Sequence, residues 1–263
     1  MRGDRRARQA RRTAKACAGL LVLVAVFETL RLLAILPSQD VPSTVDIARA
    51  LVSSVADGEL PSALGSTITA WLLGVALAAV IAVPLGVAVG RSRWADSTTR
   101  VAVEFLRPIP VVALVPVAIV LFGLEPAMQV FLVALACIWP VMLGTRHGVR
   151  AVDPLQLDTA RTFGLSGSSV MRRVVLPASL PSIVTALRVG ASLGVVVAIA
   201  AEIVSGSPGL GKLLIDNQQA GNNGVVYACL VVAGVFGVVV NLALARGERV
   251  LAGWQEATTE ALR

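Results

Sequence analysis

Apolar residues in this sequence gather in six long runs, separated by polar stretches rich in Arg, Asp, Ser and Pro. Most of these runs approach or exceed the roughly 20 apolar residues that an α-helix needs to cross the hydrocarbon core of a bilayer. Their approximate bounds are 16–36, 64–90, 109–124, 127–143, 187–205 and 225–245. The pattern predicts an all-α, polytopic membrane protein with about six transmembrane helices.

The third run is the least regular of the six. It is short and contains Pro116, so we expect a kinked or tilted helix there. Only Glu125 and Pro126 separate it from the fourth run, which predicts a tight turn between the two.

The composition argues against an ordinary soluble domain. Of the 263 residues, 56% are hydrophobic and 15% are charged, with a mean hydropathy of +0.80, whereas soluble domains carry about 25% charged residues. Paired carboxylates, a histidine cluster and a Ser/His arrangement are all missing from the sequence of the runs, so we expect neither enzymatic activity nor a cofactor. The net charge of +7 is distributed between the runs, which favours membrane topology over nucleic-acid binding.

The basic residues predict the orientation of the chain. Cytoplasmic loops accumulate Lys and Arg. Seven, four, five and three of these residues fall respectively in 1–15, 91–108, 144–186 and 246–263. With Arg188, one face receives twenty of the 23, and the other keeps Arg31, Arg49 and Lys212. Six spans therefore predict that both termini are cytoplasmic.

The same reasoning divides the chain into four regions. These are a basic cytoplasmic tail (1–15), a first helix with an extracytoplasmic loop (16–63), a membrane core (64–245) and a cytoplasmic C-terminal tail (246–263). A basic start followed by an apolar run is also typical of a signal peptide. However, the first run is long enough to span, and its sequence offers no convincing small-residue cleavage site, so we interpret it as an uncleaved helix.

The polar stretch between the fourth and fifth runs carries the clearest helix-capping signals. Asp153 can cap a short helix, with Gln156 placed to reach back to it, and Gly164 is suited to the left-handed residue that ends a helix. A second short helix is predicted to begin after Ser166 and to end at Pro177. Such a structured cytoplasmic segment is either a docking platform for a partner or a surface loop packed only on its own helices. Capping alone leaves both open.

The segment 153–183 resembles the EAA loop of bacterial ABC-importer permeases, whose short coupling helices seat in the ATP-binding subunit. This chain has Asp158-Thr159-Ala160 where the family has roughly Glu-Ala-Ala, followed by Gly164 and Leu176-Pro177. Asp and Thr thus replace the family's Glu and first Ala. The resemblance implies a coupling role for Asp158, Thr159, Ala160, Gly164, Arg172, Arg173, Leu176 and Pro177.

Neighbouring segments are similar to the nitrate/sulfonate/taurine/bicarbonate group of these permeases. They are 104–110, 148–153, 175–181 and 201–203 with 209–211. The resemblance extends in order over about 64–245. It implies a type I ABC-importer permease in the cell membrane, a homodimeric pore, an ATP-binding subunit and an extracytoplasmic solute-binding protein. The implied solute is a small anion such as an aliphatic sulfonate, taurine or nitrate.

Glu202 and the segment after it each allow two interpretations. An acidic residue in a span is a candidate for the translocation pathway, but Glu202 lies near the outer end of its helix, where water or Lys212 could satisfy it structurally. The segment 206–212 nearly matches a nucleotide-binding P-loop. Position 213 is Leu instead of the Ser or Thr that would hold magnesium, so we expect a glycine-rich turn.

Two further alternatives stay open at this point. Glu104 and Arg107 flank the entry to the third run and are either a salt bridge or ordinary interfacial charges. A secondary transporter driven by an ion gradient is the rival function. Such proteins need ionisable or broken-helix sites near the midplane, and the runs contain almost no ionisable residues. ATP dependence of uptake would discriminate between the two functions.

Overall fold

The computed structural model describes residues 18–19, 22, 24–33, 37 and 40–260. Throughout this described part the chain forms helices and no strands, which confirms the all-α fold class. In chain order the elements are α2 (Thr44–Ala56), α3 (Glu59–Arg91), α4 (Arg93–Leu106), the 3-10 turn η1 (Val111–Leu114), α5 (Val115–Phe122), α6 (Pro126–Arg150), α7 (Pro154–Thr162), α8 (Gly167–Val170), the π turn η2 (Met171–Val175), α9 (Leu176–Ser205), α10 (Leu210–Gln219) and α11 (Asn223–Glu260).

Four helical stretches among the described residues are long and apolar enough to cross a membrane. They are α3, α6, the continuous stretch Gly167–Ser205, and Asn223–Glu248 within α11. A fifth crossing requires α4 together with η1 and α5, a pair bent by 79°. The predicted first span, 16–36, lies partly outside the described residues, and the basic tail 1–15 lies wholly outside them. The count of six spans therefore stays a prediction.

The third predicted span forms a short helical stretch, Val111–Phe122, that follows a sharp break in the chain. α4 fills most of the segment 91–108 that the sequence suggested was a loop, and the chain then breaks between Leu106 and Val111. Pro108 and Pro110 lack the N–H groups that a continuing helix needs. η1 has 4 residues and α5 has 8, so together they rise only about 20 Å, less than the roughly 30 Å of the hydrocarbon core. The run 109–124 therefore cannot cross a bilayer by itself.

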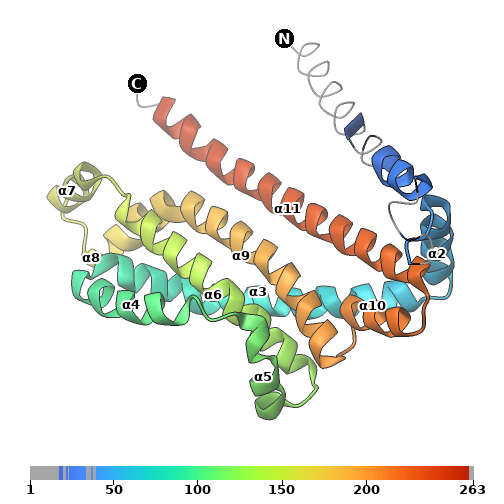
Figure 1. Cartoon of the computed structure of the whole chain (residues 1–263). Helices are drawn as coiled ribbons and strands as arrows, with labels where there is room; N and C mark the ends of the chain where they lie inside the picture. Colours follow the sequence, from blue (N-terminus) through green and yellow to red (C-terminus); the bar gives the residue numbers. More distant parts are fainter. Residues whose placement is uncertain (1–17, 20–21, 23, 34–36, 38–39, 261–263) are drawn as a thin grey trace, which may run out of the picture.

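Three long helices, α3, α6 and α9, pack along one another at the centre of the fold (Figure 1). Small residues permit this approach. A Cβ atom added to Gly86 of α3 would lie 2.6 Å from both the Met142 carbonyl oxygen and the Thr145 Cβ of α6. Close backbone approach at small residues is how helices associate where lipid removes the hydrophobic drive.

Gly86→Ala should therefore destabilise the folded protein by about 1–3 kcal/mol, because a backbone carbonyl cannot move aside as a side chain can. Thermal unfolding of the purified protein in detergent measures the effect. Gly234→Ala on α11 is the matched control, since a Cβ there meets no atom within 4 Å. Equal stability of the two variants would contradict the packing argument.

The two ends of the long helices carry different elements. α7 and α8 lie at one end, and α2 and α10 lie at the other (Figure 1). At the start of α2, Ser43 and Asp46 form a capping box, and the hydrogen bond from the Ser43 hydroxyl lowers the pKa of the Asp46 carboxyl. The segment predicted to be cytoplasmic is thus separated from the loops predicted to be extracytoplasmic by the length of the helices.

Candidate functional site

The first short helix of the segment 153–183 begins as the sequence predicts. Asp153 caps α7 by accepting a hydrogen bond from the Leu155 N–H at 2.9 Å, and Pro154 occupies the first helical position. Its predicted capping-box partner makes no such contact, because the Gln156 side chain has no hydrogen bond to Asp153 in the described part of the chain. The cap on the Asp153 side chain alone is sufficient to start α7.

Gly164 ends α7 in the predicted left-handed conformation, with φ at +74°. The Gly164 N–H donates to the Arg161 carbonyl at 2.9 Å, and the Leu165 N–H donates to the Ala160 carbonyl at 3.2 Å. These are the two bonds of a Schellman motif, which satisfies the last carbonyls of a helix. The direction of α7 relative to the following chain therefore depends on a residue without a Cβ.

The second short helix does not end at Pro177, contrary to the prediction. Ser166 does cap α8 through the Ser169 N–H, but α8 continues through η2 into α9. A proline ring clashes with the carbonyl four residues earlier and removes one N–H. That carbonyl lies in the π turn, where the wider helix accommodates the proline. One 39-residue helical stretch, Gly167–Ser205, consequently joins the segment predicted to be cytoplasmic to a candidate membrane span.

The segment has a packed inner side and an exposed apolar outer side. Ala160, Val170 and Val175 pack in one cluster with the end of α6. Phe163 is 82% exposed and Leu155 71% exposed. Phe163 follows Ala160 at the spacing of one helical turn, which predicts that it shares the packed side of α7. As the C-terminal capping residue, however, it lies past the last regular turn and faces outward. The outer side offers a partner two large apolar side chains.

The other proposed coupling residues lie on the same segment. Asp158 forms an ion pair with Arg161 at 3.2 Å, and the Thr159 hydroxyl donates to the Leu155 carbonyl at 2.7 Å. Arg172 and Arg173 are exposed on η2. Leu176 and Pro177 form the first turn of α9. The fold therefore gathers these residues around the junction of α7 with the long stretch Gly167–Ser205.

Glu202 is fully buried inside the chain. Its Oε2 accepts hydrogen bonds from the Thr67 hydroxyl at 3.1 Å and from the Gly211 N–H at 2.9 Å. The Thr67 oxygen in turn accepts from the Leu210 N–H at 2.9 Å. One carboxyl group thus connects α9 with α3 and with the first turn of α10.

Glycines allow α10 to reach this carboxyl group. A Cβ added to Gly209 would overlap the Glu202 carboxyl, and one added to Gly211 would overlap the Ile199 carbonyl. A helix N-terminus favours negative charge in this position. Lys212, the partner suggested by the sequence, pairs instead with Asp216 at 3.0 Å. The observed contacts are those of a structural connection, and the pathway role of Glu202 stays a hypothesis.

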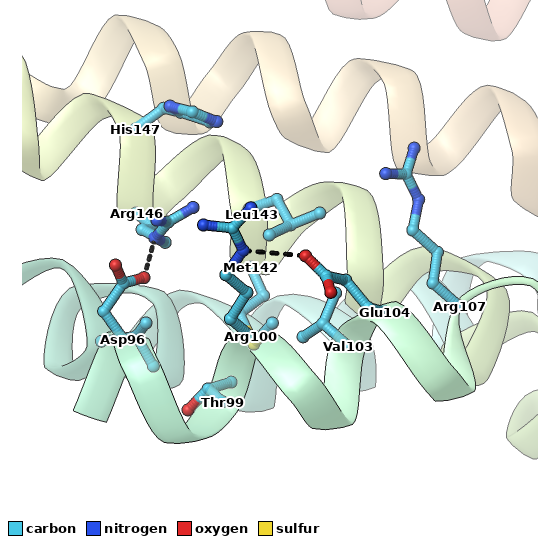
Figure 2. Close-up of a pocket in the computed structure, with 11 residues that line it drawn as sticks. Asp96, Thr99, Arg100, Val103, Glu104, Arg107, Met142, Leu143, Arg146 and His147 are labelled. Atoms are coloured by element: carbon cyan, nitrogen blue, oxygen red, sulfur yellow. Dashed lines mark hydrogen bonds and ion pairs between the residues drawn. The ribbon is translucent and has the colours of Figure 1, made fainter. Parts of the chain in front are cut away.

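A cleft of about 380 Å³ runs along α4 (Figure 2). Asp96, Arg100, Glu104 and Arg107 follow one another along α4 with spacings of three and four residues, so they share one face. Across the cleft lies the C-terminal end of α6, which contributes Arg146 among other residues. The cleft therefore has charged residues along much of its length.

The charges in this cleft are unevenly paired. Asp96 pairs with Arg146 and also with Arg150, the latter at 2.8 Å. Arg100 pairs with Glu104 at 2.8 Å, so the Glu104–Arg107 salt bridge considered from the sequence is not formed. Figure 2 shows Arg107 beyond this pair, directed away from Glu104. Its side chain has no ion pair or hydrogen bond within the described residues.

Comparison with known proteins identifies the family. The model of the family described as "binding-protein-dependent transport system inner membrane component" matches residues 82–252. This chain belongs to that family. An ABC transporter permease protein of Methanocaldococcus jannaschii is 36% identical over 65% of this chain and 64% of that relative. The aliphatic sulfonates transport permease protein SsuC of Escherichia coli is 30% identical over 89% of both chains.

The fold agrees with this membership. A solved structure of the MetNI methionine ABC transporter in an inward-facing conformation aligns with a TM-score of 0.64 at 20% sequence identity. The alignment covers 74% of this chain and 97% of that chain. The chain thus has the fold of a type I ABC-importer permease. Its relatives are transport components and not enzymes.

Lys212→Ala should leave the ATPase activity of the assembled transporter near the wild-type rate. The Lys212 ammonium pairs with Asp216 on α10, at the end of the molecule opposite α7, and no Ser or Thr follows it to hold magnesium. ATPase assays of the complex and nucleotide-binding titrations of the isolated permease measure the two consequences. Binding of ATP by the isolated permease would show that the P-loop resemblance was wrongly rejected.

Proposed function

We propose that this permease forms the pore of an ATP-driven importer for a small anion, such as an aliphatic sulfonate, taurine or nitrate. The proposed solute class rests on the similarity to the sulfonate permease SsuC over 89% of both chains. The excess of arginine along the α4 cleft suits an anionic solute. The permease acts as a homodimer and performs no chemistry itself.

The ATP-binding subunit docks on α7 and η2 in this proposal. Exposed Phe163 and Leu155 supply apolar anchors, and Arg172 and Arg173 supply charge at the rim. Because Gly167–Ser205 is one helical stretch, closure of the docked subunits moves a membrane span directly. An extracytoplasmic binding protein delivers the solute at the end that carries α2 and α10.

Uptake by the reconstituted complex tests this function. Proteoliposomes would contain the permease, its ATP-binding subunit and its solute-binding protein, with radiolabelled ethanesulfonate, taurine and nitrate as trial solutes. We expect uptake of at least one that requires ATP and is lost with a hydrolysis-deficient ATPase subunit. Uptake driven by an ion gradient without ATP would instead support the secondary-transporter alternative.

Orientation has a separate test. Twenty of the 23 basic residues fall on one predicted side, so residues 43–59 should be extracytoplasmic and residues 164–173 cytoplasmic. Single cysteines placed in each stretch, in a protein lacking Cys17, Cys137 and Cys229, should react with an impermeant thiol reagent from opposite sides. Labelling of both stretches from outside the cell would exclude the six-span topology.

A further inference from the structure

The α4 cleft carries positive charge to the depth of the membrane spans. α4 has 14 residues and so rises about 20 Å from its start beside the cytoplasmic end of α3. Val103, one turn before Arg107, packs in a cluster with Ala82 of α3 and Met142 of α6. Both lie inside helices long enough to span. Arg107 is therefore level with the cytoplasmic half of these candidate spans, although the count of basic residues assigned it to the loop 91–108.

Arg107 is exposed at this depth without a partner in the described part of the chain. The cleft is lined by the three arginines 100, 107 and 146 and by two carboxylates, Asp96 and Glu104, which leaves one positive charge in excess. Ionisable residues at membrane depth face a water-filled cavity or a polar partner, because lipid tails cannot solvate them. The free guanidinium thus requires an aqueous or anionic neighbour.

The backbone next to Arg107 gives an independent argument. Residues 104–110 are exposed, and the helix is interrupted between Leu106 and Val111. Irregular backbone at membrane depth is tolerated only where protein covers it or where it lines a water-filled cavity. The interruption and the unpaired charge therefore point to the same aqueous surface.

We propose that the α4 cleft is an anion-binding site on the cytoplasmic half of the translocation pathway, in which Arg107 binds the anionic oxygens of the solute. A guanidinium donates two parallel hydrogen bonds to a carboxylate, sulfonate or similar oxyanion. Arg100 is already neutralised by Glu104, so Arg107 supplies the uncompensated charge of this pair of turns. The inference rests on the proposed importer function and specifies how that importer selects anions.

Ile109, 38% exposed beside the interruption, offers a reporter position. Ile109→Cys would be introduced into a protein without the three native cysteines and assembled with the ATP-binding subunit in nanodiscs of zwitterionic lipid. Reaction rates of this reporter thiol would be compared for an anionic reagent, sulfonatoethyl methanethiosulfonate, and its cationic trimethylammonium analogue. Arg107→Gln should lower the ratio of anionic to cationic rate by about fivefold, as expected for loss of one nearby charge. Arg107→Lys should largely preserve the ratio.

Arg246→Gln is the matched control, since Arg246 is an exposed arginine of α11 and does not line the cleft. It should leave the ratio unchanged. Ethanesulfonate should slow the modification of the reporter thiol when Arg107 is present and have no effect in Arg107→Gln. An unchanged ratio in Arg107→Gln, or failure of both reagents to reach the reporter thiol, would overturn the proposal.

A lipid phosphate is the other source of an oxyanion. Protection of the reporter thiol by nanodiscs containing phosphatidylglycerol, with none by ethanesulfonate, would assign the site to a headgroup and overturn the proposal. ATP-dependent uptake measured on the same preparations separates the two claims. ATP-dependent uptake together with an unchanged rate ratio in Arg107→Gln would refute the anion site and support the importer function. A lowered rate ratio in Arg107→Gln together with ATP-independent uptake would refute the importer function and support the anion site.

Discussion

Replacing Gly164 by Val should remove most ATP-driven uptake while leaving the protein inserted in the membrane. The residue at this position has a φ of +74°, which a β-branched side chain resists. Holding valine in this left-handed conformation costs about 1–3 kcal/mol. That cost is equivalent to a roughly 5- to 150-fold shift in the equilibrium between permease with and without a docked ATP-binding subunit. Relief of this strain breaks the Schellman bonds and changes the direction of α7. The ATP-binding subunit would then lose its correctly placed contact.

Co-purification of the ATP-binding subunit and uptake by the reconstituted complex measure this effect. Gly164→Asn is the first control, because Asn tolerates the left-handed conformation. Gly167→Val is the second, because a Cβ there meets no atom within 4 Å and no positive φ is needed. Both controls should keep most of the uptake. Full uptake and normal subunit association in Gly164→Val would show that the segment is only a surface loop.

Features that depend on local sequence were predictable. Hydrophobic runs predicted α3, α6 and α11 because each residue in a span contributes its transfer free energy independently of its neighbours. Asp153 and Gly164 were predictable because a cap involves residues within one turn. The candidate coupling segment was therefore recognisable before its structure was known, apart from the outward position of Phe163.

Features that depend on tertiary contacts were not predictable. The sequence pattern suggested that Pro177 ends a helix, since nothing in it indicates the π turn that accommodates the ring. A kink was expected at Pro116, but the chain breaks earlier, between Leu106 and Val111. The helix before this break looked like a loop because the segment 91–108 holds four arginines. Glu202 meets Thr67 across 135 positions of sequence. No local pattern reveals a contact at that separation.

That contact leads to a second large effect. Glu202→Ala should detach the start of α10 from α3 and α9. The Gly211 N–H loses its acceptor inside the fold, at a cost of about 1–3 kcal/mol for a buried donor left unsatisfied. The lost side chain also leaves a cavity beneath Gly209, which now contacts the carboxyl directly. We expect a lower thermal stability and a large loss of uptake.

Glu202→Gln separates a structural role from a pathway role. The carboxamide oxygen can replace Oε2 as acceptor for Thr67 and Gly211, and the amide nitrogen then takes the position of Oε1, which has no hydrogen-bond partner among the described residues. If the carboxyl acts as a connection, Gln should retain much more stability and uptake than Ala. Thermal unfolding in detergent and uptake kinetics of both variants measure this. Equal loss of uptake in the two, with stability preserved, would mean that the negative charge itself is required, as a pathway role demands, because only a charged group attracts or repels a passing solute at long range.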